Sequence, residues 1–274
     1  MREDWIEEMR GCWVVYKITS GSVVERIKVW RSGTTPTVRR KRVKGGVLPK
    51  KAEANLRGAV KRLARILNTN FTERDLFVKL SYTTLPEDWR GQERETANFM
   101  QRLKRAIRSA GGGDVKWISV CSEVSATTGE PVRPHVHVIV TGGSIQFRDG
   151  HWWCGKRTLD DIWGLGGVYA EPLRQMSDYT PLALYLVRQA GKDENRQKWH
   201  SSRNMEKSVV EESVVMTDSE LRAPAGSVVT EKIYDPERGI NYVRYIRQDK
   251  GGRSENEKEG RRRAWKNHCG RDGG

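Results

Sequence analysis

Arg-Pro-His-Val-His-Val-Ile-Val, residues 133–140, is the most informative stretch of this 274-residue sequence. In a β-strand, side chains two positions apart point to the same face. His135 and His137 therefore share one face, and the valines that alternate with them share the other, where they can pack against helices. The stretch predicts a strand of a helix-covered sheet that presents two neighbouring imidazoles on one face.

The segments around this strand alternate between strand and helix patterns. The apolar stretch 115–124 is separated from it by a turn containing Gly129 and Pro131, which predicts an antiparallel hairpin over 115–141. The order of elements predicts an α+β fold over about 70–191, with a central, mostly antiparallel sheet and helices on one face. The other expected elements are strands over 76–82 and 168–171 and helices over 93–110, 159–163 and 178–190.

The regions on either side of this core predict further strands, a helix and a charged tail. Residues 12–30 alternate loosely around Ser20-Gly21 and indicate a hairpin, followed by a basic arm and an amphipathic helix. Residues 226–246 predict another pair of strands, and the charged chain after Arg247 is expected to be disordered. The expected division is residues 1–67 (hairpin, basic arm over 36–51, helix over 52–67), 68–246 (core with a C-terminal extension) and 247–274 (basic tail).

Basic residues outnumber acidic residues by 50 to 35, which gives a formal net charge of +15. Between residues 36 and 68 the only acid is Glu53. A cluster this one-sided predicts a polyanionic partner, and nucleic acid is favoured because each Lys or Arg that meets a phosphate releases condensed counterions. Anionic lipid and an acidic protein are the alternatives. The residues of this region expected to contact DNA are Arg39, Arg40, Lys41, Arg42, Lys61, Arg62 and Arg65.

Several classes of protein are not expected. No run approaches the roughly 20 apolar residues that span a bilayer, and the N-terminal stretch lacks the apolar segment of a signal peptide. With a hydrophobic fraction of 36% that includes ten Trp, wholesale disorder is not expected either. We expect a soluble, cytoplasmic protein whose thiols are reduced, because no Cys-x-x-Cys pair occurs among Cys12, Cys121, Cys154 and Cys269.

Two imidazoles side by side on an open sheet face provide two ligands of a metal site. Glu123 lies near the end of the preceding strand, and the hairpin places it where a third ligand is needed. An acid in an otherwise apolar strand costs free energy unless it is compensated, and a cation would compensate it. Two His and one carboxylate leave coordination positions open for a phosphate. The alternatives are a structural pair of histidines and an exposed edge glutamate.

Tyr185, in the expected helix over 178–190, is the candidate nucleophile. Arg188 lies three residues later on the same helical face. Its charge lowers the cost of ionising a phenol, whose ordinary pKa is about 10, and a guanidinium also binds phosphate oxygens in a bidentate manner. Tyr179 lies on a different face of the helix. A tyrosine that only packs within an amphipathic helix is the alternative.

These segments resemble the motifs of the HUH endonucleases, in particular the rolling-circle replication-associated (Rep) proteins of bacterial plasmids and small single-stranded phages. Residues 76–82 resemble the apolar first motif, 133–140 the His-hydrophobe-His second motif and 185–188 the third. The family usually has Lys where this chain has Arg188. Residues 198–204 resemble a Ser-Arg-Asn signature that follows the tyrosine helix in one bacterial branch. The likeness covers about residues 68–246.

The resemblance implies a ferredoxin-like or RRM-like HUH core that nicks single-stranded origin DNA. His135, His137 and Glu123 would hold Mg²⁺ or Mn²⁺, and Tyr185 would form a 5′-phosphotyrosyl intermediate that a later transesterification resolves. Arg203 would be a phosphate contact. The sequence has no Gly-x₄-Gly-Lys-Ser/Thr loop. The resemblance therefore implies that a host helicase would unwind the DNA and a host polymerase would extend the nicked strand, in a bacterial cytoplasm.

Two other functions stay open at this point. A non-catalytic nucleic-acid-binding protein on the same fold would need only the basic charge and the aromatic side chains. A metal-dependent hydrolase would use the His pair to activate water, and its products would not be linked to protein. Relaxase and transposase activities are closely related to the favoured nicking activity.

Overall fold

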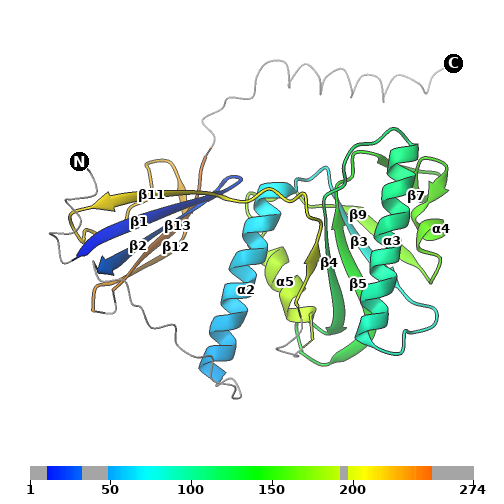
Figure 1. Cartoon of the computed structure of the whole chain (residues 1–274), viewed down its shortest axis with the longest axis horizontal. Helices are drawn as coiled ribbons and strands as arrows, with labels where there is room; N and C mark the ends of the chain where they lie inside the picture. The colour runs from blue at the N-terminus through cyan, green and yellow to red at the C-terminus, as the bar shows by residue number, and fades with distance from the viewer. Residues whose placement is uncertain (1–10, 33–48, 192–196, 238, 249–274) are drawn as a thin grey trace.

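The computed structural model describes residues 11–32, 49–191, 197–237 and 239–248. Two five-stranded sheets lie on either side of helices α2 (Pro49–Asn70) and α5 (Thr180–Gln189) (Figure 1). Arg39, Arg40, Lys41 and Arg42 lie outside the described residues, as does nearly all of the expected tail, so those predictions stay predictions. No helix of the described part is long and apolar enough to cross a membrane.

The sheet that carries the His pair, called the histidine sheet below, has the strand order β10-β4-β5-β3-β9. Every neighbouring pair is antiparallel. This confirms the predicted α+β class, the hairpin over 115–141 and the strand over 168–171, which lies at one edge of the sheet. The strands are β10 (His200–Ser201), β4 (Trp117–Val124), β5 (Pro131–Val140), β3 (Leu76–Ser81) and β9 (Val168–Pro172).

Helices cover both faces of the histidine sheet, whereas the sequence predicted helices on one face. Helices α3 (Trp89–Ser109) and α4 (Leu159–Trp163) pack on the valine face of β5. Helices α2 and α5 pack on the opposite face, against Ile139 and its neighbours. The prediction was wrong because it considered only the two histidines on that face. Ile139 continues the same alternation, and an isoleucine needs cover from water.

The second sheet, called the terminal sheet below, is built from both ends of the described chain. Its strand order is β11-β1-β2-β13-β12, and the predicted hairpin around Ser20-Gly21 is confirmed as β1–β2. Because β2 pairs with β13, residues 11–32 and 209–246 form one unit, which crosses the boundary expected at residue 67. The strands are β1 (Gly11–Ser20), β2 (Val23–Ser32), β11 (Val209–Val215), β12 (Val228–Asp235) and β13 (Ile240–Ile246).

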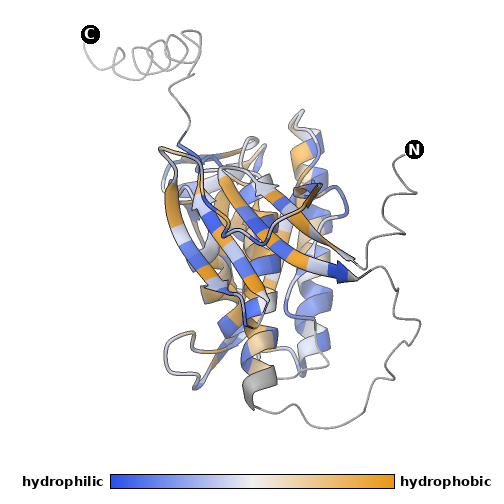
Figure 2. Cartoon of the chain, turned by 90° about the vertical axis from the view of Figure 1, so that its left-hand side faces the viewer, coloured by the Kyte–Doolittle hydropathy of each residue, from blue (hydrophilic) through white to orange (hydrophobic). Residues whose placement is uncertain are grey.

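Polar and apolar residues are interspersed along the strands of the terminal sheet (Figure 2). Its turn at Gly21 has a φ of +57°, and a Cβ there would collide with the carbonyl oxygen of Asn68 at the end of α2. The hairpin tip therefore packs closely on the helix because the residue is glycine. The small core on the face away from α2 consists of Val15, Val24, Leu221, Val243 and Tyr245.

Two further features complete the fold. A small third sheet follows β5 and was not predicted; it consists of β6 (Ile145–Arg148), β7 (His151–Cys154) and β8 (Arg157–Thr158). The three cysteines in the described part, Cys12, Cys121 and Cys154, are buried and form no disulfide with one another.

Helix α5 is joined to the terminal sheet by a buried ion pair between Asp178 and Arg244. Arg244 donates to the two carboxylate oxygens of Asp178 at 2.6 and 2.8 Å and to Thr180 Oγ1 at 2.7 Å. Asp178 also accepts from the Thr180 backbone N–H at 2.9 Å and from Asn68 Nδ2 of α2 at 3.2 Å. These bonds fix the N-terminal end of α5, the helix that carries Tyr185.

This ion pair makes stability depend on pH. Burial alone raises the pKa of the Asp178 carboxyl, but hydrogen bonds and charge from Arg244 outweigh burial and lower the pKa to about 2. The unfolded-state pKa is about 3.9, so the carboxylate contributes about 2 kcal/mol that is fully present above about pH 5 and is lost as pH falls toward 2.

Urea unfolding of wild type and Asp178→Asn should therefore differ most at pH 5 and above, and the difference should shrink steadily down to pH 2.5. The amide does not titrate, so it is the matched control. A difference that is constant across this range would show that the charge of Asp178 does not stabilise the fold.

Candidate active site

His135 and His137 project from β5 on the α5 side of the histidine sheet, with their Nε2 atoms 3.1 Å apart. The side chain of His137 is fully buried and that of His135 is partly buried. The Arg133 carbonyl lies 2.9 Å from Nδ1 of His135. A carbonyl only accepts, so Nδ1 carries the proton and Nε2 keeps its lone pair. The strand therefore turns a ligating nitrogen of His135 toward its neighbour.

Gln189, in the last turn of α5, completes the group. Its Oε1 lies 2.9 Å from Nε2 of His137 and accepts a hydrogen bond from Ser122 Oγ at 2.5 Å. Ser122 is the partner of His135 across the β4–β5 ladder. This hydrogen bond from Ser122 holds the amide oxygen of Gln189 beside His137.

These three donor atoms fit a divalent cation. Two ligands bound to one Mg²⁺ at about 2.1 Å and at right angles lie about 3.0 Å apart. The separations here are 3.1 Å between the two Nε2 atoms and 2.9 Å from His137 Nε2 to Gln189 Oε1. Two imidazoles and one neutral oxygen also suit Mn²⁺, which accepts both nitrogen and oxygen ligands.

Both histidines are held in the neutral form that binds metals. Burial lowers the pKa of His137 to about 4, and the charges of His135 and Lys79 act in the same direction, while the hydrogen bond that His137 donates to Gln189 Oε1 opposes them. Burial is also the main cause that lowers the pKa of His135. The pair is therefore unprotonated near pH 7.

Glu123 does not complete this group. Among the described residues no three His, Cys, Asp or Glu side chains come together as a metal site. The β4–β5 ladder is irregular between Ser122 and Val124, and the carboxylate of Glu123 lies against Gly191, just after α5. In this structure the amide oxygen of Gln189, and not the carboxylate of Glu123, lies beside the His pair. One signal in the sequence could have indicated this: Gln189 lies four residues after Tyr185, on the same face of the helix.

Tyr185 is brought to the His pair as the sequence predicted. Its ring centroid lies 5.6 Å from that of His137, across the space between α5 and the sheet. The side chain is 41% exposed, and no described residue makes a hydrogen bond to its hydroxyl. Arg188 is also exposed, one turn further along α5. The ring of Tyr185 thus lies close to the imidazole of His137 and is accessible from solvent.

Two residues that the sequence reasoning missed extend this face. Lys79 of β3 is the cross-strand partner of His137, and Tyr169 of β9 is the partner of Lys79. Lys79 lies near enough for its charge to lower the pKa of both histidines. Tyr169 is 58% exposed. A cation and an aromatic ring therefore continue the row that begins at the His pair.

The basic residues of α2 have different environments. Arg65 is paired with the buried Glu25 of β2 at 2.5 Å, and Lys61 lies 3.4 Å from Glu231 of β12. These two charges join α2 to the terminal sheet. Of the three α2 residues predicted to contact DNA, Arg62 is the one that is exposed and makes no ion pair with a described residue.

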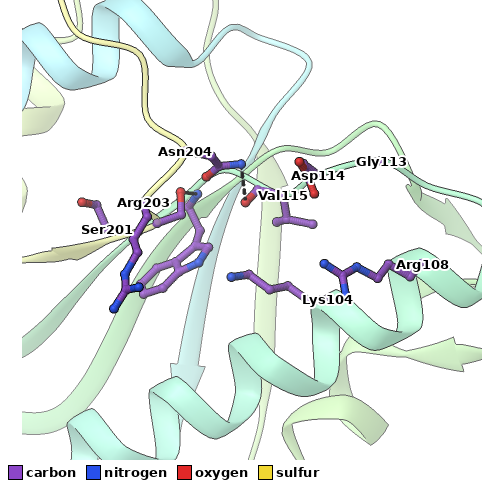
Figure 3. A pocket seen from close by; sticks show the side chains of 10 residues that line it. Lys104, Arg108, Gly113, Asp114, Val115, Ser201, Arg203 and Asn204 are labelled. Atoms are coloured by element: carbon purple, nitrogen blue, oxygen red, sulfur yellow. Dashed lines mark hydrogen bonds between the residues drawn. The ribbon is translucent and has the colours of Figure 1, made fainter.

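Arg203 lies in a pocket on the α3 side of β4, together with Lys104 and Arg108 (Figure 3). The structure thus places this predicted phosphate contact away from the histidines, which face α5. No family model, no curated protein and no solved structure matches this chain.

Proposed function

We propose that this chain nicks and rejoins single-stranded DNA through a 5′-phosphotyrosyl intermediate, as an initiator of rolling-circle replication. The proposal depends on one observation: the donor atoms of His135, His137 and Gln189 converge beside the Tyr185 ring on one face of the sheet. The net charge of +15 supports a nucleic-acid substrate. The two Nε2 atoms and Gln189 Oε1 would hold Mg²⁺ or Mn²⁺, which withdraws charge from phosphate oxygens when bound.

The chain's own residues account for the covalent step. The phenol oxygen of Tyr185 attacks phosphorus in line with the 3′ oxygen that leaves. The P–O bond to tyrosine forms and the P–O3′ bond breaks; the phenol loses its proton and the 3′ oxygen gains one. One phosphodiester replaces another, so attack by a 3′-OH reverses the step and rejoins the strand. Arg188 is the candidate cation at the phosphate oxygens.

The row from His137 through Lys79 to Tyr169 gives the substrate strand a route across the sheet. Lys79 would contact a phosphate beside the scissile one, and the exposed ring of Tyr169 would stack on a base, as aromatic side chains do in single-strand binding proteins. Stacking requires unpaired bases, so this route favours single-stranded over duplex DNA.

A pool of 3′-labelled single-stranded oligonucleotides with randomised hairpin loops, incubated with the protein and Mn²⁺, tests the function. The proposal expects a labelled species linked to protein on a denaturing gel, and none in EDTA. A non-catalytic binding protein would retain the DNA on a native gel without any linked species. A hydrolase would shorten the DNA and leave no label on protein. Either of these outcomes would contradict the proposed function.

Gln189→Leu is expected to weaken Mn²⁺ binding at least tenfold, measured by calorimetry. The substitution removes one of three donor atoms while keeping a side chain of similar size, and even the groups that only orient metal ligands contribute tenfold or more. Glu123→Gln is the matched control and should bind Mn²⁺ as wild type does. Loss of Mn²⁺ affinity in Glu123→Gln but not in Gln189→Leu would show that the third metal ligand is the carboxylate of Glu123 and not Gln189.

A further inference from the structure

The strongest feature outside the candidate active site is a basic pocket between α3 and the loop that follows β10. It has a volume of about 390 Å³. Lys104 and Arg108 reach into it from α3, and Arg203 reaches in from the loop (Figure 3). The remaining lining residues are Gly113, Asp114, Val115, Trp117, Ser201, Ser202 and Asn204.

Positive charge exceeds negative charge in this pocket, with three basic side chains against one acid among the described residues that line it. None of Lys104, Arg108 and Arg203 makes an ion pair with a described residue, and Asp114 is the one acid that lines the pocket. Lys104 and Arg108 are four residues apart on α3, where like charges destabilise a helix by a few tenths of a kcal/mol. The arrangement therefore costs stability in the free protein, and an anion between the three side chains would reverse that cost.

The loop that carries Arg203 is fixed before any ligand binds. Ser202 donates its backbone N–H to the Trp117 carbonyl at 2.9 Å, and its hydroxyl accepts from the Trp117 backbone N–H at 3.1 Å. Asn204 Nδ2 donates to the Val115 carbonyl at 3.4 Å. The Ser202-Arg203-Asn204 run thus uses its two outer residues to hold the loop on β4 and presents the guanidinium between them to the pocket.

The pocket is separate from the His pair. Trp117 packs with the α3 core, on the opposite face of the histidine sheet from His137. Trp117 lies opposite Val140 in the ladder, whereas Ser122 lies opposite His135. These five residues along β4 correspond to about 17 Å. A phosphate bound here cannot be the one that Tyr185 attacks.

We infer that this pocket binds a backbone phosphate of the DNA at a distance from the scissile bond, so that the bound DNA continues around the β10 edge of the sheet. Two guanidiniums and an ammonium match the oxygens of a phosphodiester, and the hydroxyl of Ser201, which also lines the pocket, suits the same ligand. The inference rests on the nucleic-acid part of the proposed function but not on the nicking step.

Fluorescence anisotropy with a labelled single strand and a labelled hairpin, over a series of salt concentrations, tests this inference. Arg203→Ala and Lys104→Ala should each weaken binding about tenfold, the loss expected for one hydrogen bond to a charged group. Each should also reduce the slope of log affinity against log salt by about 0.7 to 0.9, the value of one phosphate contact. Arg203→Lys should restore the slope but only part of the affinity.

Arg105→Ala is the matched control, because Arg105 is exposed on the same helix and does not line the pocket. If Arg203→Ala and Lys104→Ala behave like Arg105→Ala, the inference is wrong. It is also wrong if inorganic phosphate or a mononucleotide binds the pocket with micromolar affinity while the salt slope for DNA is unchanged, since the site would then take a free anion. Loss of DNA affinity in a protein that never forms a covalent adduct would support the pocket and contradict the nickase.

Discussion

Tyr185→Phe is expected to abolish the covalent protein–DNA species while DNA affinity changes less than twofold. The substitution removes one oxygen, which is the atom that would attack phosphorus, and leaves the ring that packs 5.6 Å from His137. No described residue makes a hydrogen bond to that hydroxyl, so its loss does not disturb the fold. Removing a covalent nucleophile lowers turnover by on the order of 10³-fold or more. A denaturing gel with 3′-labelled DNA and Mn²⁺ measures the adduct.

Tyr169→Phe is the control for this experiment. Tyr169 lies on the same face of the histidine sheet and is more exposed than Tyr185. If exposure alone decided which tyrosine reacts with DNA, Tyr169 would therefore be the nucleophile. The Tyr169→Phe variant should form the adduct at the wild-type rate, because phenylalanine keeps the ring that would stack on a base. Mass spectrometry of the conjugate identifies the modified residue. An adduct that persists in Tyr185→Phe, or one located on another tyrosine, would remove Tyr185 from the mechanism.

Arg244→Met is expected to lower the free energy of unfolding by about 3–5 kcal/mol, the usual effect of leaving one member of a buried ion pair without its partner. Asp178 would keep its carboxylate at the junction of α2, α5 and β13 while losing the two hydrogen bonds of 2.6 and 2.8 Å that compensate it. The side chains of Arg244 and Asp178 are only 10% and 15% exposed, so water replaces little of this loss. Urea unfolding followed by circular dichroism measures the change.

Two further variants test whether the loss of stability comes from leaving a buried charge without its partner. Lys17→Ala breaks an exposed pair with Glu211 on the terminal sheet and should cost less than 1 kcal/mol. The double variant Asp178→Leu with Arg244→Met should be more stable than Arg244→Met alone, because no buried charge is left. Equal destabilisation by Arg244→Met and Lys17→Ala would show that the junction does not depend on this pair.

The local sequence was sufficient to predict the strand and the helix that carry the candidate site residues. Period-two alternation in residues 133–140 places His135 and His137 on one face whatever the sheet's partners are, because the direction of a side chain follows from the strand's own backbone. Helical periodicity predicted α5 in the same way, and with it the helix that carries Tyr185. Both predictions depend on geometry within a single element, and both are confirmed.

The third member of the group depended on the tertiary structure. Glu123 was chosen by extending the alternation of β4, but the ladder is irregular between Ser122 and Val124. Gln189 lies beside the His pair because α5 packs on this face of the sheet, which brings its last turn to His137. Neither an irregular ladder nor the packing of a helix on a sheet can be predicted from the periodicity of one segment.

The sequence by itself determined the alternating strands, the amphipathic helices, the paired imidazoles and the excess of positive charge, because each follows from a short run of residues. Only the tertiary structure decided that strands from both ends of the chain share one sheet, that helices cover both faces of the other, and that Arg203 meets Lys104 and Arg108. Those features join segments as far apart in the chain as Val23 and Ile246, and which segments meet depends on packing and hydrogen bonding over the whole chain.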